Sequence, residues 1–267
     1  MDPATILGLL IAFGALFGTI TLEGASVASI TLPAPMLLVL VGTVAVGMAG
    51  STMKDFVHAV KSLPKAFTGK PPKPGESIEQ IVALADKARR EGLLSLEAAA
   101  AETKDPFLRN ALQNIADGTD GEDLRELLDD AVETKIKSDH TAAKFFTTLG
   151  GYAPTVGIIG TVVSLTHVLE NLSKPEELGH MIAAAFVATL WGLLSANFIW
   201  LPIGGRLGRL SELEVDRMIL ITEGVLAVQA GSQPTLLRER LTAMVPAYRQ
   251  HGGKKSGGSG VQARDAA

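Results

Sequence analysis

The sequence predicts an all-α integral membrane protein with four transmembrane helices and a cytoplasmic helical domain, from three observations. Of its 267 residues, 47% are hydrophobic and only 19% are charged, which is unusual for a soluble domain of this size. Four apolar runs contain no Asp, Glu, Lys or Arg, and each is long enough to cross a bilayer. Between the second and third runs the pattern becomes amphipathic with a helical period.

The first two runs predict a transmembrane hairpin within residues 1–53. Residues 4–22 would span about 28 Å as a helix, close to the roughly 30 Å of a hydrocarbon core. This run contains Gly14 and Gly18 at the GxxxG spacing that lets helix backbones approach closely, although glycines can also be scattered on a lipid-facing helix. Residues 32–53 form the second run. The N-terminus lacks the basic region and cleavage site of a secretory signal, so the first span is expected to be retained.

The last two runs predict a second hairpin within residues 144–205. It is rich in small and hydroxyl-bearing residues, which pack against other helices or line a narrow wet path. Pro154 lies inside the third span and frees a backbone carbonyl one turn earlier, so it could be a hinge or a static kink. Pro202 is predicted to end the fourth span at the cytoplasmic edge. His167, near the outer end of the third span, could gate ions but is more simply an interfacial histidine.

Basic residues predict the orientation. Five lysines follow the second run and two arginines follow the fourth, so the positive-inside rule places both flanks in the cytoplasm. Both termini are then cytoplasmic, in a multi-pass membrane protein. Almost nothing remains outside, which argues against a receptor or an adhesion protein.

The soluble parts are predicted to be helical. Residues 54–143 contain a proline-broken connector at residues 68–77, followed by a helix that Gly92 ends, and Thr119 or Asp120 is a plausible N-cap further on. Residues 206–251 continue as helices, with Pro234 beginning the last one. The low-complexity segment 252–267 is expected to be disordered. One apolar face is predicted to carry Ile78, Ile81, Val82, Ala85 and Ala88.

Several function classes are excluded by what the sequence lacks. There is no Cys, the five histidines have no metal-ligand spacing, and no phosphate-binding glycine loop or nucleophile elbow occurs. We therefore predict no catalytic residues, no metal site, no cofactor and no enzymatic activity. A net charge of −4 argues against a nucleic-acid partner.

The predicted spans also lack an interior Asp or Glu, which proteins that move protons or sodium usually keep on the path. If the chain conducts ions, a partner must supply the carboxylate, and Thr161 and Thr189 could contribute hydroxyl oxygens. These threonines could instead bond back to their own helix carbonyls. Arg89 and Glu97 flank Gly92, where they could face one partner surface or be solvated charges.

The chain resembles the A subunit of the flagellar stator, the MotA/PomA (motility protein A) family. The resemblance rests on ARREGLLSLE at residues 88–97, DPFLRNALQNIADGTDGEDLRELL at 105–128, YAPTVGIIGTVVSL and ATLWGLLSANFIWLPI in the second hairpin, and LAVQAGSQPTLLRERL at 226–241. It implies that Arg89 and Glu97 contact a FliG-type rotor switch protein. It also implies that Pro154 and Pro202 are the functional prolines and that Thr161 and Thr189 line the ion path.

The resemblance further implies partners and a transported ion. A homo-oligomeric ring, a pentamer, would surround MotB/PomB-type B subunits within membrane lipid, and each B subunit would supply an ion-binding Asp. The ion would be a proton or sodium, and Thr161 favours sodium. The alternatives are an ExbB/TolQ-type energiser, which typically has three spans, and a non-conducting membrane scaffold.

Overall fold

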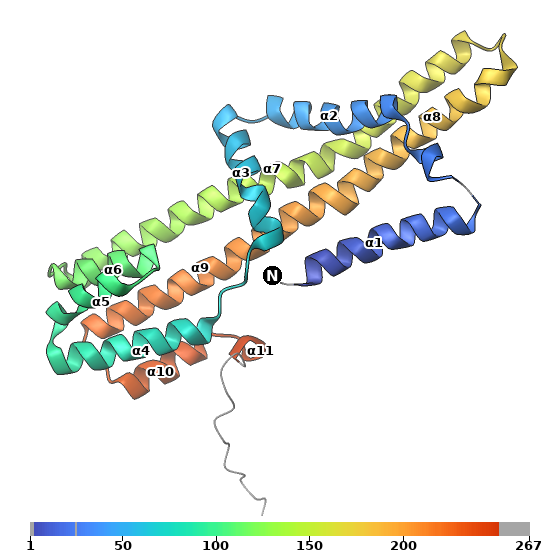
Figure 1. Ribbon diagram of the computed structural model, residues 1–267. Helices are drawn as coiled ribbons and strands as arrows, with labels where there is room; N and C mark the ends of the chain where they lie inside the picture. Colours follow the sequence, from blue (N-terminus) through green and yellow to red (C-terminus); the bar gives the residue numbers. More distant parts are fainter. Residues whose placement is uncertain (1–2, 25, 251–267) are drawn as a thin grey trace, which may run out of the picture. The chain divides into compact units, whose positions relative to one another are not determined.

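The computed structural model describes residues 3–24 and 26–250, and these residues form helices joined by short turns, with no strand among them (Figure 1). This confirms the predicted all-α class. The predicted disordered tail, residues 252–267, lies outside the described residues. The helices are α1 (Pro3–Leu22), η1 (Val27–Ile30), α2 (Pro33–Ala49), α3 (Met53–Thr68), α4 (Pro74–Glu91), η2 (Leu93–Ser95), α5 (Leu96–Glu102), α6 (Pro106–Ala116), α7 (Gly121–Glu170), α8 (Pro175–Leu194), η3 (Ser195–Trp200), α9 (Leu201–Gln229), α10 (Pro234–Ala243) and α11 (Ala247–Gln250).

The chain divides into two compact units. The first comprises the chain up to Pro71 together with Ile136–Glu212, and the second comprises Pro72–Lys135 and the chain from Leu213 onward. Of the three boundaries between the units, one falls within α7, one falls within α9, and the third, between Pro71 and Pro72, falls in the connector between α3 and α4. Each unit has its own buried apolar cluster.

The first unit contains the apolar helices. Among the described residues, three helical stretches are long and apolar enough to cross a membrane: α1, α7, and the continuous run from α8 to α9. Helix α2 is apolar too but has 17 residues, about 26 Å. It stops at Ala49, earlier than the predicted run to Met53, because Thr52 begins a new helix by accepting a hydrogen bond from the Asp55 N–H at 3.2 Å.

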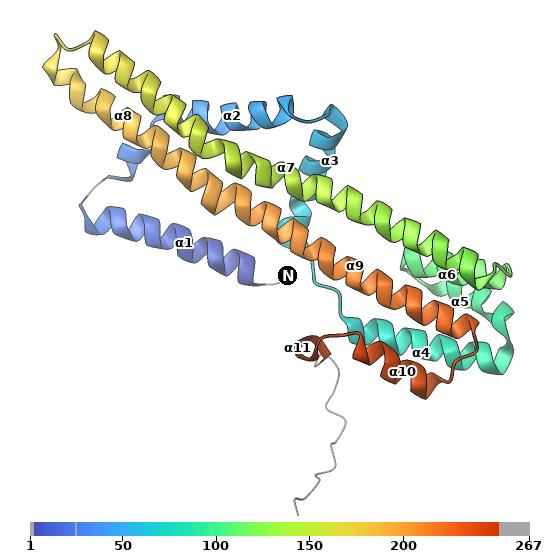
Figure 2. The ribbon, with the colours of Figure 1, turned by 180° about the vertical axis from the view of Figure 1, so that it is seen from behind.

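Helices α7 and α8 lie side by side (Figures 1 and 2) and touch through their backbones. A Cβ atom built on Gly157 would lie 3.0 Å from the Gly192 Cα. One turn along α7, a Cβ on Gly160 would lie 2.9 Å from the Ala188 Cβ and 3.2 Å from a methyl carbon of Leu38 on α2. The glycines of the second hairpin therefore form the close helix packing that the sequence predicts.

Pro202 does not interrupt the helix, and that it ends the fourth span stays a prediction. A π-helical segment, η3, comes directly before it, and the Leu201 N–H donates to the carbonyl of Ala196, five residues earlier. Proline has no N–H, so Pro202 cannot make the usual hydrogen bond to the carbonyl four residues earlier. The π-helical turn just before Pro202 accommodates this missing bond, and α9 continues to Gln229.

The second unit is an amphipathic bundle of short helices together with residues 121–135 of α7 and 213–229 of α9. The apolar face predicted for α4 is buried. Gly92 ends α4 with φ +85°, and the Asp120 carboxylate caps α7 by accepting from the Glu122 N–H at 2.9 Å, both as predicted. Pro234 begins α10 as predicted, while the connector before α4 is only residues 69–73, shorter than expected.

Candidate functional site

Thr161 of α7 and Thr189 of α8 face each other. Their hydroxyl oxygens are 2.5 Å apart. The Thr161 hydroxyl also lies 3.1 Å from the Gly157 carbonyl oxygen of its own helix and 3.0 Å from the Ala185 carbonyl oxygen of α8. Since a hydroxyl carries one hydrogen, Thr161 can donate to one of these carbonyls while it accepts from Thr189. Thr161 is therefore placed to bond back to its own helix, one of the two alternatives from the sequence, while a role of its hydroxyl in an ion path stays a prediction.

Four oxygen atoms gather at this point in an otherwise apolar hairpin. Two are hydroxyl oxygens and two are backbone carbonyl oxygens, and oxygen ligands of this kind suit hard cations. Both threonine side chains are half-buried. Within the part of the chain that the structure describes, no group of three or more His, Asp or Glu residues could hold a metal ion.

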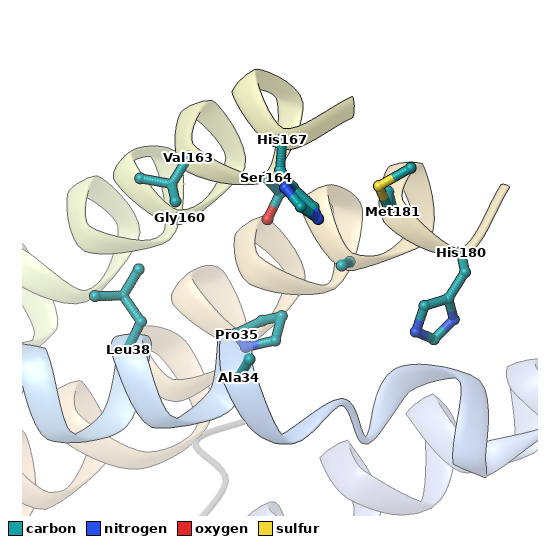
Figure 3. Close-up of a pocket in the computed structure, with 10 residues that line it drawn as sticks. Ala34, Pro35, Leu38, Gly160, Val163, Ser164, His167, His180 and Met181 are labelled. Carbon is teal, nitrogen blue, oxygen red and sulfur yellow. The ribbon is translucent and has the colours of Figure 1, made fainter. Parts of the chain in front are cut away.

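A cavity of about 380 Å³ opens between α2, α7 and α8 beside this point (Figure 3). Ser164, His167 and His180 line it among apolar side chains. His167 Nδ1 is 3.7 Å from a carboxylate oxygen of Glu170, and the Asn171 amide lies 3.4 Å from the same nitrogen. The sequence pointed to His167 but not to His180 or to the α2 residues, because no spacing along the chain links these elements. The α2 residues are Ala34, Pro35 and Leu38.

The two prolines flank one close contact between helices. Pro154 leaves the Gly150 carbonyl without its usual intrahelical donor, and a Cβ on Gly150 would lie 2.6 Å from the Leu201 side chain. Leu201 directly precedes Pro202. The proline-weakened turns of both helices are therefore neighbours in space, which the sequence could not show.

Arg89 and Glu97 are both exposed on the second unit. Arg89 is in the last turn of α4 and Glu97 in the first turn of α5, with the left-handed Gly92 between them. Neither side chain forms an ion pair within residues 3–24 and 26–250, whereas the neighbouring Arg90 pairs with Asp86. Both charges are accessible to another molecule.

Comparison with known proteins identifies the family. Residues 6–92 match the model of the motility protein A N-terminal region, and residues 99–219 match that of the MotA/TolQ/ExbB proton channel family. Motility protein A of Bacillus subtilis (strain 168) is 34% identical over 252 residues, which cover 92% of each protein.

The chain belongs to the motility protein A family. A second family member, chemotaxis protein PomA of Vibrio alginolyticus, is 32% identical over 237 residues, covering 89% of this chain and 92% of PomA. The match to the motility protein A N-terminal model favours this family over the ExbB-type energiser, which was the alternative from the sequence.

Solved structures of the family have the same fold. A chain of C. jejuni MotAB superposes with a TM-score of 0.89 at 29% identity, covering 92% of this chain and 97% of that one. A chain of the flagellar MotAB stator complex from Bacillus subtilis superposes with a TM-score of 0.84 at 34% identity, covering 91% and 96%. The apolar helices fit a subunit of a membrane complex.

Proposed function

We propose that this chain is a flagellar motor stator subunit, which forms an ion-conducting channel with a MotB-type partner and converts ion flow into torque. The observation that carries the proposal is the Thr161–Thr189 hydroxyl pair, 2.5 Å apart, on two apolar spans that have no interior Asp or Glu. An oxygen-rich point can pass an ion along, but a group that binds and releases it must come from elsewhere. The B subunit's Asp would be that group. No enzymatic reaction is part of the proposal.

Exposed apolar surface supports an assembly with other chains in lipid. The outward face of α7 in the hairpin exposes large aliphatic side chains, which are Ile158, Ile159, Val162 and Val163. Such a surface suits a membrane or neighbouring helices. We propose a homo-oligomeric ring, a pentamer, around the B subunits.

The proposed location is the bacterial inner membrane, with four spans and both termini in the cytoplasm. The lysines that follow α2 and the arginines near the start of α9 support this orientation. Residues 1–53 and 144–205 would be the membrane hairpins, and 54–143 and 206–251 the cytoplasmic parts.

The proposed rotor contacts are Arg89 and Glu97, facing a FliG-type switch protein. Their exposure and their lack of ion pairs in the described chain support this role. Opposite charges on consecutive helices can meet a complementary pair on a partner. Pro154 and Pro202 would couple ion passage to helix movement, which their shared contact through Gly150 and Leu201 supports.

The ion path is tested by removing one hydroxyl at a time. Thr161→Val or Thr189→Val should abolish or strongly reduce swimming in a stator-less strain that carries the chain with its B subunit, because valine has a similar shape but no oxygen. Thr166→Val is the matched control, since the Thr166 hydroxyl bonds only to the Val162 carbonyl of its own helix at 2.9 Å. Normal swimming of both path variants, with normal membrane levels, would refute the proposed path.

A further inference from the structure

Helix α3 has two distinct faces and follows directly after the apolar helix α2. Only residues 50–52 separate α2 from α3. One face of α3 is packed against its own unit and the other is open. The open face combines apolar and basic side chains, a combination that nothing in the proposed ion path or rotor contact uses.

The packed face fixes α3 in place. Ala59 and Ala66 are fully buried in the apolar cluster of the first unit. The Phe56 ring packs edge to face on the Phe145 ring of α7, with the two ring centroids 5.6 Å apart. Lys65 is held by Asp139 of α7 at 3.5 Å. The orientation of the open face is therefore set by folding.

The open face forms a strip of apolar residues bordered by lysines. Met53, Val57 and Val60 are 65%, 40% and 45% exposed, and their spacing of four and three residues places them on one side of the helix. Lys54 and Lys61 are exposed and stand seven residues apart, two turns along the same border. Neither lysine has an ion-pair partner in the described part of the chain.

A shallow hollow lies on this strip. Its volume is about 330 Å³, and it is lined by Met53, Lys54, Val57, His58 and Lys61. Two cations and two apolar side chains therefore border one concave surface. The His58 ring is held in place by the Ser138 carbonyl oxygen at 3.1 Å.

The position of the strip indicates which kind of molecule can bind there. A helix that starts three residues after an apolar spanning helix lies at the level of the lipid headgroups. Apolar side chains there enter the acyl boundary, while the amines of lysines on the border reach phosphate oxygens. Two unpaired cations select a lipid of net negative charge over a zwitterionic one.

We propose that this strip is a binding site for an anionic phospholipid. Lys54 and Lys61 hold its headgroup, and Met53, Val57 and Val60 contact its acyl chains. The site belongs to the leaflet at the Ala49 end of α2. It depends on α2 lying in the membrane but not on ion conduction or torque, so it can fail while the proposed function holds.

The test is lipid selectivity of the full chain purified with its B subunit. A fluorescent phosphatidylglycerol is competed with unlabelled phosphatidylglycerol or phosphatidylcholine in detergent. We expect the wild type to prefer phosphatidylglycerol and Lys54→Gln/Lys61→Gln to bind it about 30-fold more weakly, roughly fivefold for each lysine. Lys87→Gln/Lys104→Gln, two lysines of the second unit without an ion pair in the described chain, should bind as the wild type does.

A second variant tests the contribution of the apolar side chains to lipid binding separately from that of the lysines. Val57→Asn should weaken binding of both lipids while the preference between them stays. Equal binding of both lipids by the wild type, or unchanged selectivity of the double lysine variant, would overturn the proposal. If Val57→Asn instead breaks the oligomer in light scattering and leaves lipid binding unchanged, the strip is an interface between copies and the lipid assignment is wrong.

Discussion

Gly157 of α7 and Gly192 of α8 meet backbone to backbone. A Cβ on Gly157 would lie 3.0 Å from the Gly192 Cα and 2.9 Å from the Ala188 carbonyl oxygen. Thr161 comes four residues after Gly157, and Thr189 comes three residues before Gly192. Because the helices run in opposite directions, the glycine contact is what brings the two hydroxyl groups to 2.5 Å.

Gly157→Ala should therefore disturb both packing and the ion path. The added methyl group meets backbone atoms, which cannot rotate away, so we expect a loss of about 1–3 kcal/mol and slower swimming. Gly151→Ala is the control, since a Cβ there meets nothing within 4 Å. Thermal unfolding of the purified complex measures both variants, and equal midpoints would show that the glycine contact is not tight.

Arg217 links two elements of the second unit through ion pairs. It contacts the Asp105 carboxylate, which also caps α6, and the Glu214 carboxylate at 2.7 Å. Burial lowers the pKa of Arg217, but the hydrogen bonds that its guanidinium donates to Glu214 and Asp105 outweigh burial and raise this pKa above its usual value. The guanidinium contribution to stability is complete below the unfolded pKa and is lost only as pH rises through the folded pKa, so ordinary pH changes should not remove it.

Arg217→Met should cost about 2–3 kcal/mol, less than for a fully buried pair because the side chains remain partly exposed. The variant leaves two carboxylates without their cation. Arg90→Met, which breaks only the exposed pair with Asp86, should cost no more than about 0.5 kcal/mol. Urea unfolding, followed by circular dichroism, compares the two variants. Similar losses in the free energy of unfolding would contradict the larger contribution of Arg217 to stability.

Substitution of Gly92 should destabilise the fold because of the backbone conformation at this position. Its φ of +85° and ψ of 165° fall in a region that only glycine adopts readily. Gly92→Ala should cost about 1–3 kcal/mol and shift Arg89 relative to Glu97. Gly75→Ala, in the first turn of α4 with open space around it, should leave the unfolding midpoint unchanged.

Arg89→Glu should lower motor torque without loss of assembly. The side chain is exposed and unpaired in the described chain, so its charge can be reversed at little cost to folding. Tethered-cell rotation measures the torque, and a compensating charge reversal on the rotor protein should restore it. Arg90→Glu is the control, and loss of membrane insertion in Arg89→Glu would show that the residue is structural.

The sequence could predict what depends on local pattern. Helix faces, the Gly92 stop and the Asp120 cap follow from periodicity and from residues that satisfy free backbone groups, and all are found. The π segment before Pro202 could not be predicted, because its register depends on how the helix accommodates a missing N–H.

Contacts between helices could not be predicted from the sequence either, because they depend on how the helices cross in three dimensions. Thr161 and Thr189 could be singled out as hydroxyls on apolar helices, but their 2.5 Å separation depends on the crossing at Gly157 and Gly192. The cavity that includes His180 likewise needs α2 and α8 to meet. No motif encodes these distances.

The most direct test of the stator assignment is swimming speed in a stator-less flagellated strain that carries this chain with its B subunit. Sodium is varied at a fixed proton-motive force. We predict that motility is restored and that speed rises with sodium, as expected for a path through Thr161. Motility that does not depend on sodium but stops with a proton uncoupler would support the stator function and show that the transported ion is a proton. No motility, with both subunits present in the membrane, would contradict the assignment.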